Sequence, residues 1–170
     1  MACLAWEFKE RGVERINIMK LAEALQERAD LNKRIDELRR RLNNCILVQD
    51  GEEPVEDPLQ LLKELDEAIE FLEKRMAQIN RTNCHTKIKG MTLTQIIAKK
   101  DALLLKLSAY RDLVYSAGQN TERARGTEIK IKAALSVKDM QHRVDCMAKE
   151  ARDLDNMLQE TNWKTDLIEA

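Results

Sequence analysis

The sequence predicts a mainly α protein whose two antiparallel helical hairpins form an elongated four-helix bundle. Three observations lead to this fold class. Charged residues make up 35% of the 170 residues and aromatic residues only 4%, a composition typical of helical proteins. Five glycines and two prolines are too few for the many tight turns of an all-β fold. Apolar residues recur at helical spacing in four long segments, which indicates four amphipathic helices.

The four apolar stripes run over residues 21–42, 61–79, 93–114 and 140–158. The fourth stripe advances by alternating steps of 4 and 3 residues, which is the heptad pattern of a coiled coil. The third segment is apolar on more than one side, so we expect it to be the most buried helix, with Leu104 and Leu107 both inside.

Three helix starts carry capping signals. Asp57 precedes Pro58, which combines an N-cap residue with proline at the first helical position. Thr92 and Gln95 have the spacing of a capping box, in which each side chain binds the other residue's backbone N–H. Ser136 precedes the fourth helix in the same way. We therefore expect helices to begin just after positions 57, 92 and 136.

The chain contains an internal duplication. Residues 19–42 match residues 91–114 at a shift of 72 positions, and residues 58–88 match residues 137–167 at a shift of 79. Neither alignment needs a gap, and the apolar positions keep their phase. This self-similarity indicates two related hairpins.

The duplication defines the expected domain organisation. Residues 1–18 are an N-terminal extension, and residues 19–170 are a single helical domain. The repeat halves cover about 19–88 and 91–167, and we expect pseudo-twofold symmetry between them.

A Thr-Asn-x-x-Thr signature occurs at the end of each half. Its candidate functional residues are Asn83 and Thr86 in the first copy and Asn162 and Thr165 in the second. Asparagine tolerates the left-handed conformation that ends a helix, and threonine bonds to nearby backbone. The signature therefore predicts a duplicated helix stop, with a pseudo-symmetric ligand-binding pocket as the alternative.

The loops inside the two hairpins have opposite charges. The first is rich in Asp and Glu and has no Lys or Arg, whereas Lys and Arg outnumber Asp and Glu in the second. Each contains a strand-like run, with Ile46 and Val48 in the first and Ile129 and Ile131 in the second. Because a lone strand leaves backbone groups unpaired, we expect these runs to pair as a short two-stranded β ribbon.

The cysteines and histidines favour neither a metal nor a cofactor. None of the four cysteines stands in a CxxC pair, so we expect reduced thiols in a cytoplasmic protein. His142 and Cys146 are four residues apart, but their only companions would be the adjacent pair Cys84 and His85, which rarely chelate together. We expect no metal and no cofactor.

Composition also limits the possible partners. A helix that spans a bilayer needs about 20 consecutive apolar residues. The sequence contains no such stretch, so a membrane partner is not expected. The net charge of −1 favours no nucleic-acid partner, and the basic triplet at 39–41 is interpreted as a solvated helix face. With two histidines and no catalytic constellation, the chain is expected not to be an enzyme.

Several short motifs together resemble one bacterial family. They are Met19–Leu25, Gly51–Pro54, Ile79–Asn83 and Thr161–Thr165, and the resemblance covers about residues 19–167. Members of this family are often labelled septicolysin. The resemblance brings no established activity, although the label implies a cytolysin.

The sequence favours a non-enzymatic interaction or scaffold protein that self-associates, as a homodimer or a larger assembly. The heptad stripe and the mixed charge support this prediction. One alternative is a small-ligand-binding bundle that uses the Asn and Thr residues or the duplicated Asp66 and Asp145. The other is a membrane-active, cytolysin-like protein, as the family label implies. Residues 3–8 also resemble the Trp-rich loop of the cholesterol-dependent cytolysins.

Overall fold

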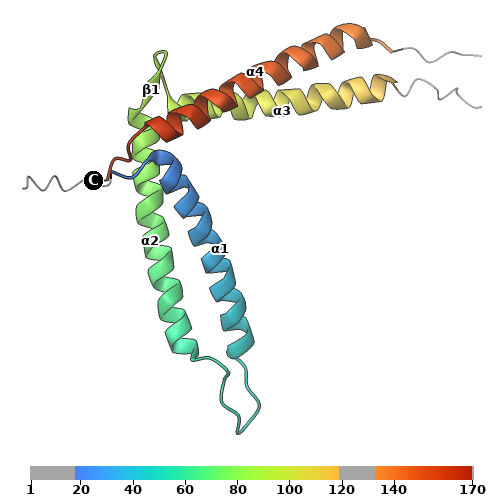
Figure 1. Cartoon of the computed structure of the whole chain (residues 1–170). Coiled ribbons are helices and arrows are strands. Elements are labelled where there is room, and N and C mark those ends of the chain that lie inside the picture. The colour runs from blue at the N-terminus through green and yellow to red at the C-terminus, as the bar shows by residue number, and fades with distance from the viewer. Residues whose placement is uncertain (1–17, 119–132, 170) are drawn as a thin grey trace, which may run out of the picture.

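A computed structural model describes residues 18–118 and 133–169. It contains four helices and a small antiparallel sheet, which confirms the mainly α class with a short β ribbon (Figure 1). Residues 1–17, Ile129 and Ile131 lie outside the described residues. The elements in chain order are α1 (Leu21–Cys45), α2 (Pro58–His85), β1 (Lys87–Ile88), β2 (Met91–Thr92), α3 (Leu93–Gly118) and α4 (Val137–Lys164).

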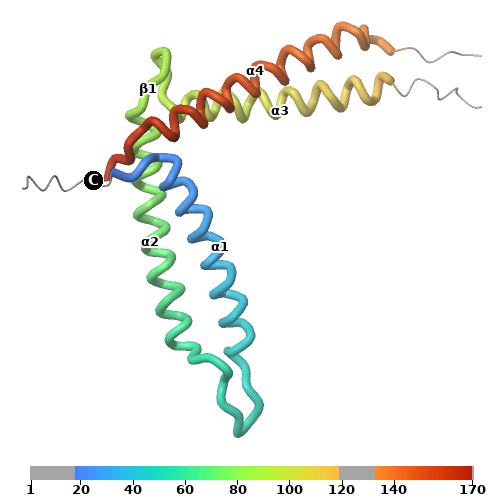
Figure 2. Tube along the Cα trace, in the orientation of Figure 1, coloured from blue at the N-terminus to red at the C-terminus, as the bar shows by residue number. Residues whose placement is uncertain are grey.

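The helices form two arms that diverge from a common junction. Helix α1 packs along α2, and α3 packs along α4. Figures 1 and 2 show that the two arms point in different directions, with the ribbon at their meeting point. The described part of the four helices therefore shares a common core at the junction, and each arm is two helices thick beyond it.

The junction core draws residues from all four helices and the C-terminal segment. Its buried members are Leu21, Ala24, Ile79, Leu93, Ile96, Leu154, Leu158 and Leu167. A second, smaller core lies within the α1–α2 arm, where Leu38 and Cys45 pack on Leu61 and Ala68. The buried positions of α4 follow the predicted heptad steps, with Val144, Ala151, Leu154 and Leu158 inside.

The predicted helix starts are confirmed by their hydrogen bonds. The Asp57 carboxylate accepts a bond of 2.9 Å from the Leu59 N–H, and Ser136 Oγ accepts one of 3.3 Å from the backbone of the fourth helix. Thr92 and Gln95 form both bonds of the capping box, at 2.9 and 3.2 Å. These side chains replace the partners that the first turn of a helix lacks.

The two connections at the junction are equivalent under the shifts of the duplication. The Leu93 N–H donates to the Thr86 carbonyl at 3.0 Å, and the Leu21 N–H donates to the Thr165 carbonyl at 2.9 Å. The pairing of Lys87 with Thr92 in the ribbon has its counterpart in an isolated bridge between residues 20 and 166. The segments next to α1 and α4 thus form the same backbone pairing as the covalent connection between α2 and α3.

The ribbon in the described residues is formed by residues 87–92, and the predicted pairing of Ile46 and Val48 with Ile129 and Ile131 stays a prediction. Ile46 and Val48 are 66% and 50% exposed and belong to no strand. They lie in the loop at the far end of the α1–α2 arm, away from the junction (Figure 1). The observed ribbon instead turns at Lys89 and Gly90, whose φ angles of 50° and 84° are those of a two-residue hairpin.

The expectation that the third helix is the most buried is wrong, because α3 has three buried residues whereas α1, α2 and α4 have four, five and four. One of its two central leucines is nevertheless buried as expected. Leu107 is 4% exposed, but Leu104 is 43% exposed. The neighbouring Leu105 is 75% exposed. Beyond the junction α3 packs on α4 alone, so its other apolar sides stay uncovered in the described chain. Apolar excess on this helix therefore did not mean burial.

Candidate functional site

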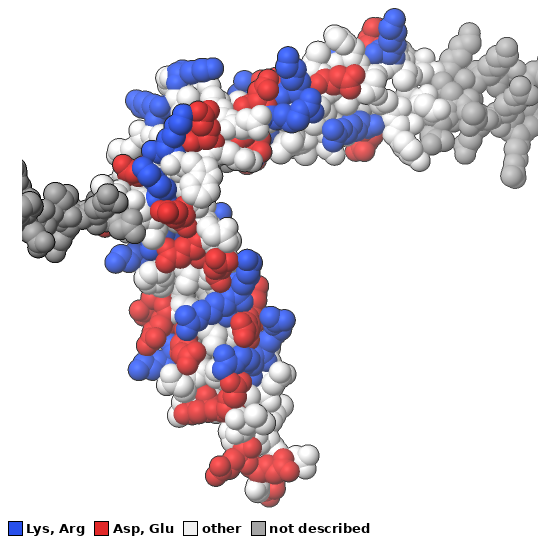
Figure 3. Space-filling view, in the orientation of Figure 1, with Lys and Arg blue, Asp and Glu red and all other residues white. Residues whose placement is uncertain are grey.

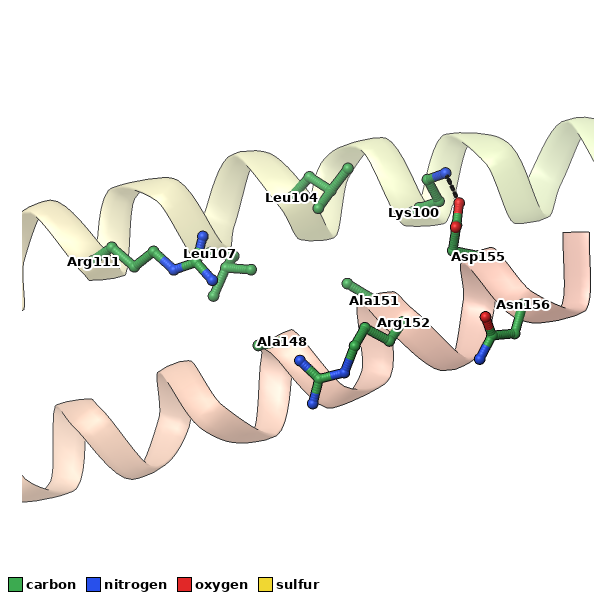
Figure 4. A pocket seen from close by; sticks show the side chains of 9 residues that line it. All are labelled: Lys100, Leu104, Leu107, Arg111, Ala148, Ala151, Arg152, Asp155 and Asn156. Carbon is green, nitrogen blue, oxygen red and sulfur yellow. Dashed lines mark hydrogen bonds and ion pairs between the residues drawn. The ribbon is translucent and has the colours of Figure 1, made fainter. Parts of the chain in front are cut away.

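An open groove of about 390 Å³ lies between α3 and α4 (Figure 4). Leucine and alanine side chains form its floor, and charged or amide side chains form its rim. The floor consists of Leu104, Leu107, Ala148 and Ala151, and the rim of Lys100, Arg111, Arg152, Asp155 and Asn156.

Small residues on α4 create the groove. Ala148 and Ala151 lie where the helix faces α3, and their methyl groups leave the space between the helices unfilled. The shift of 79 places Ile69 and Leu72 at the same two positions of α2. The α1–α2 arm therefore carries large apolar side chains where the α3–α4 arm carries alanines.

One end of the groove is closed by an ion pair. The Lys100 ammonium on α3 binds the Asp155 carboxylate on α4, as the dashed line in Figure 4 shows. Gln159 donates a further bond of 2.8 Å to the same carboxylate. The hydrogen bond and charge of Lys100 hold the pKa of Asp155 below its ordinary value, so this carboxylate is ionised at neutral pH.

Arg111 and Arg152 lie further along the groove (Figure 4). Within residues 18–118 and 133–169, neither guanidinium forms an ion pair. A second hollow continues past both arginines and is also lined by Val144 and Tyr115. The two hollows thus present apolar surface on either side of the two arginines, and Asp145 lines the second hollow beside them.

The side chains that line the groove indicate which kind of ligand it suits. Of the described residues that line the groove, none is a cysteine, serine, threonine or histidine. Apolar floor and guanidinium rim together match a ligand with apolar side chains and neighbouring carboxylates, because arginine binds carboxylates in a bidentate manner.

The four predicted Asn and Thr residues lie at the junction, away from this groove. Thr86 and Thr165 are the C-caps of α2 and α4, and their carbonyl oxygens accept the bonds from α3 and α1 described above. Asn83 and Asn162 are partly buried in the last turn of each helix. These positions fit the predicted helix stop, and ligand binding there stays a prediction.

Two features of the structure were missed by sequence reasoning. Thr82 is completely buried, donates to the Gln78 carbonyl at 2.8 Å and accepts the Ile168 N–H at 3.0 Å. The groove was missed as well, although Ala151 on the buried stripe of α4 and the nearby Ala148 were a visible signal. A heptad stripe shows which side of a helix faces its partner, but whether side chains fill the space between the two helices depends on the residues of both.

The described cysteines and histidines are dispersed. Cys146 is 3.8 Å from the His142 ring on α4, whereas Cys84 lies 3.6 Å from the Thr94 hydroxyl near the junction. Over the described ranges, no group of three or more His, Cys, Asp or Glu side chains is placed to hold a metal ion. None of the described helices combines the length and the apolar character that crossing a membrane requires.

Comparison with known proteins gives a family without an assigned activity. No curated protein matches the sequence. A crystal structure of a functionally unknown conserved protein from Corynebacterium diphtheriae is similar, with 37% sequence identity and a TM-score of 0.82. That similarity covers 88% of this chain and 99% of the other chain. The septicolysin resemblance stays a prediction. A family model matches residues 28–167, and the chain therefore belongs to the family described as "Family of unknown function (DUF6847)".

Proposed function

We propose that the protein is a non-enzymatic interaction protein that self-associates through its two helical arms. One observation carries the proposal. Leu62, Ile69 and Met76 recur at heptad intervals along α2, beside the seam with α1, and are 46%, 47% and 44% exposed. We call these three side chains the α2 ridge.

A heptad stripe next to an occupied seam is typical of a helix that has a second helical partner. Fully burying such a side chain stabilises an assembly by about 1.5–3 kcal/mol, so covering the exposed half of three contributes about 2–4 kcal/mol per ridge. Two reciprocal ridges would double this contribution. The energy is sufficient to offset part of the cost of association, which is several kcal/mol.

The charge distribution supports association with a mixed-charge partner such as a second copy. Figure 3 shows Lys and Arg interspersed with Asp and Glu along both arms on the visible face. The net charge is −1, so two copies do not repel each other strongly as whole molecules.

Self-association is tested by measuring the mass of the full chain in solution. Sedimentation equilibrium or light scattering is the suitable measurement, because neither depends on shape and the arms are elongated. We expect twice the mass of a single chain, and we expect this mass to decrease on dilution. A mass of one chain at every concentration reached would overturn the proposed function.

A further inference from the structure

We propose that the groove between α3 and α4 receives the α2 ridge of a second copy of this chain. The inference rests on the proposed self-association and names its site and its occupant. It joins the heptad apolar ridge described on α2 to the apolar groove described on the other arm.

The duplication makes the two surfaces complementary in shape. At the shift of 79, the ridge positions 62, 69 and 76 correspond to Gln141, Ala148 and Asp155 on α4. At the middle position Ile69 therefore projects from one arm where the other arm has only Ala148 on the groove floor, and polar Gln141 and Asp155 stand at the two outer positions. Exposed Leu104 on α3 adds apolar surface on the facing side of the groove.

The two surfaces are also complementary in charge. Asp66 and Glu73 lie one helical turn after Leu62 and Ile69, and both are exposed. Within the described residues neither carboxylate forms an ion pair. A ridge flanked by Asp66 and Glu73 thus meets a groove bordered by Arg111 and Arg152, and such complementarity of charge selects the correct partner.

The ridge of the same chain cannot fill its own groove. Ile69 and Ala148 lie equally far from the junction ends of their helices. These ends are His85 for α2 and Lys164 for α4. From the helical rise of about 1.5 Å per residue, each is about 24 Å from the junction along a different arm. Figures 1 and 2 show these arms diverging, so the occupant must come from another molecule.

Because these distances from the junction are equal, the same two molecules can form two ridge-in-groove contacts with each other. A second copy that places its ridge in the groove of the first can offer its own groove to the first ridge. Such a pair has twofold symmetry and uses both arms of each chain, so it closes as a dimer.

The test compares two exposed apolar residues of the full chain. Ile69→Glu places a charge on the ridge, and Leu105→Glu places the same charge on the outer side of α3, away from the groove. We expect Ile69→Glu to raise the dimer dissociation constant at least about tenfold. Leu105→Glu should leave it unchanged. Thermal melting followed by circular dichroism checks that both variants remain folded.

A mixing experiment tests the reciprocal arrangement. Arg152→Glu alters the groove, whereas Ile69→Glu alters the ridge, so a mixed pair keeps one intact ridge and one intact groove facing each other. We expect each variant alone to be mainly monomeric and the mixture to form a one-to-one heterodimer.

The outcomes separate this inference from the proposed function. A wild-type dimer that persists in Ile69→Glu, or the absence of a heterodimer in the mixture, would overturn the ridge-in-groove contact while self-association stands. A monomeric wild-type protein would overturn both.

Discussion

Replacing Thr82 with valine should destabilise the fold mainly through one of the two hydrogen bonds of its hydroxyl, the bond that it accepts from Ile168. Valine has nearly the same shape as threonine, so the packing of this fully buried side chain is kept. The Ile168 N–H, which now donates to Thr82 Oγ1 at 3.0 Å, would lose its acceptor in a partly buried position. Leaving such a donor unpaired costs about 1–3 kcal/mol. The Gln78 carbonyl loses less, because it also accepts the helical bond from the backbone of residue 82.

We expect Thr82→Val to lower the free energy of unfolding by about 1–2 kcal/mol. For a chain of this length that corresponds to a decrease in Tm of about 2–8 °C. Thr161→Val is the matched control, because its hydroxyl donates to the Met157 carbonyl at 2.8 Å in the same way. Over the described residues, Thr161 Oγ1 accepts no backbone N–H, so its replacement should cost clearly less. The free energy of unfolding of both variants is measured in urea. Equal decreases for Thr82→Val and Thr161→Val would refute the reasoning.

Three further changes have definite expectations. At dilutions at which the chain is monomeric, Leu107→Ala should cost about 2–4 kcal/mol in urea unfolding because the side chain is buried, and Leu104→Ala should cost less than half as much. Similar losses for the two variants would contradict this difference in burial. Hydrogen bonds from Arg41 hold the pKa of Glu56 below its ordinary value of 4.5, so this carboxylate stabilises the fold above that pH and the contribution disappears as pH falls through the lowered pKa. Wild type and Glu56→Gln should therefore differ in Tm at neutral pH and converge in acid, and a constant difference would contradict this. Gly90→Ala should cost about 1 kcal/mol because φ is +84° there, and an unchanged Tm would argue against the turn.

Local features of the fold could be predicted because they depend on a few neighbouring residues. Asp57, Ser136 and Thr92 mark helix starts through bonds that span two or three positions, and the structure contains each of them. The seam of α4 was likewise visible as a period. Such signals specify where a helix begins and which side faces its nearest partner.

The arrangement of the arms and the groove could not be predicted in the same way. The sequence does not show whether an apolar side chain such as Leu104 packs within its own chain, packs against a second copy or is exposed to solvent. The groove depends on the size of Ala148 relative to the residues across from it, which requires the register of two helices. The place of the ribbon depended on a two-residue turn at Gly90, and the longer apolar runs elsewhere masked that weaker signal.

The pairing between the two ends of the helical region affects the order in which the molecule can form during synthesis. The first N–H of α1 finds its acceptor at the carbonyl of Thr165, and the Leu167 N–H binds the Met19 carbonyl at 2.8 Å. The α1–α2 hairpin can therefore emerge from the ribosome early, but its base stays incomplete until nearly the whole helical region has been made. Contacts between residues so distant in sequence form late and slowly. The hydrogen bonds that hold the start of α1 therefore form only after α4 and the residues that directly follow it have been made.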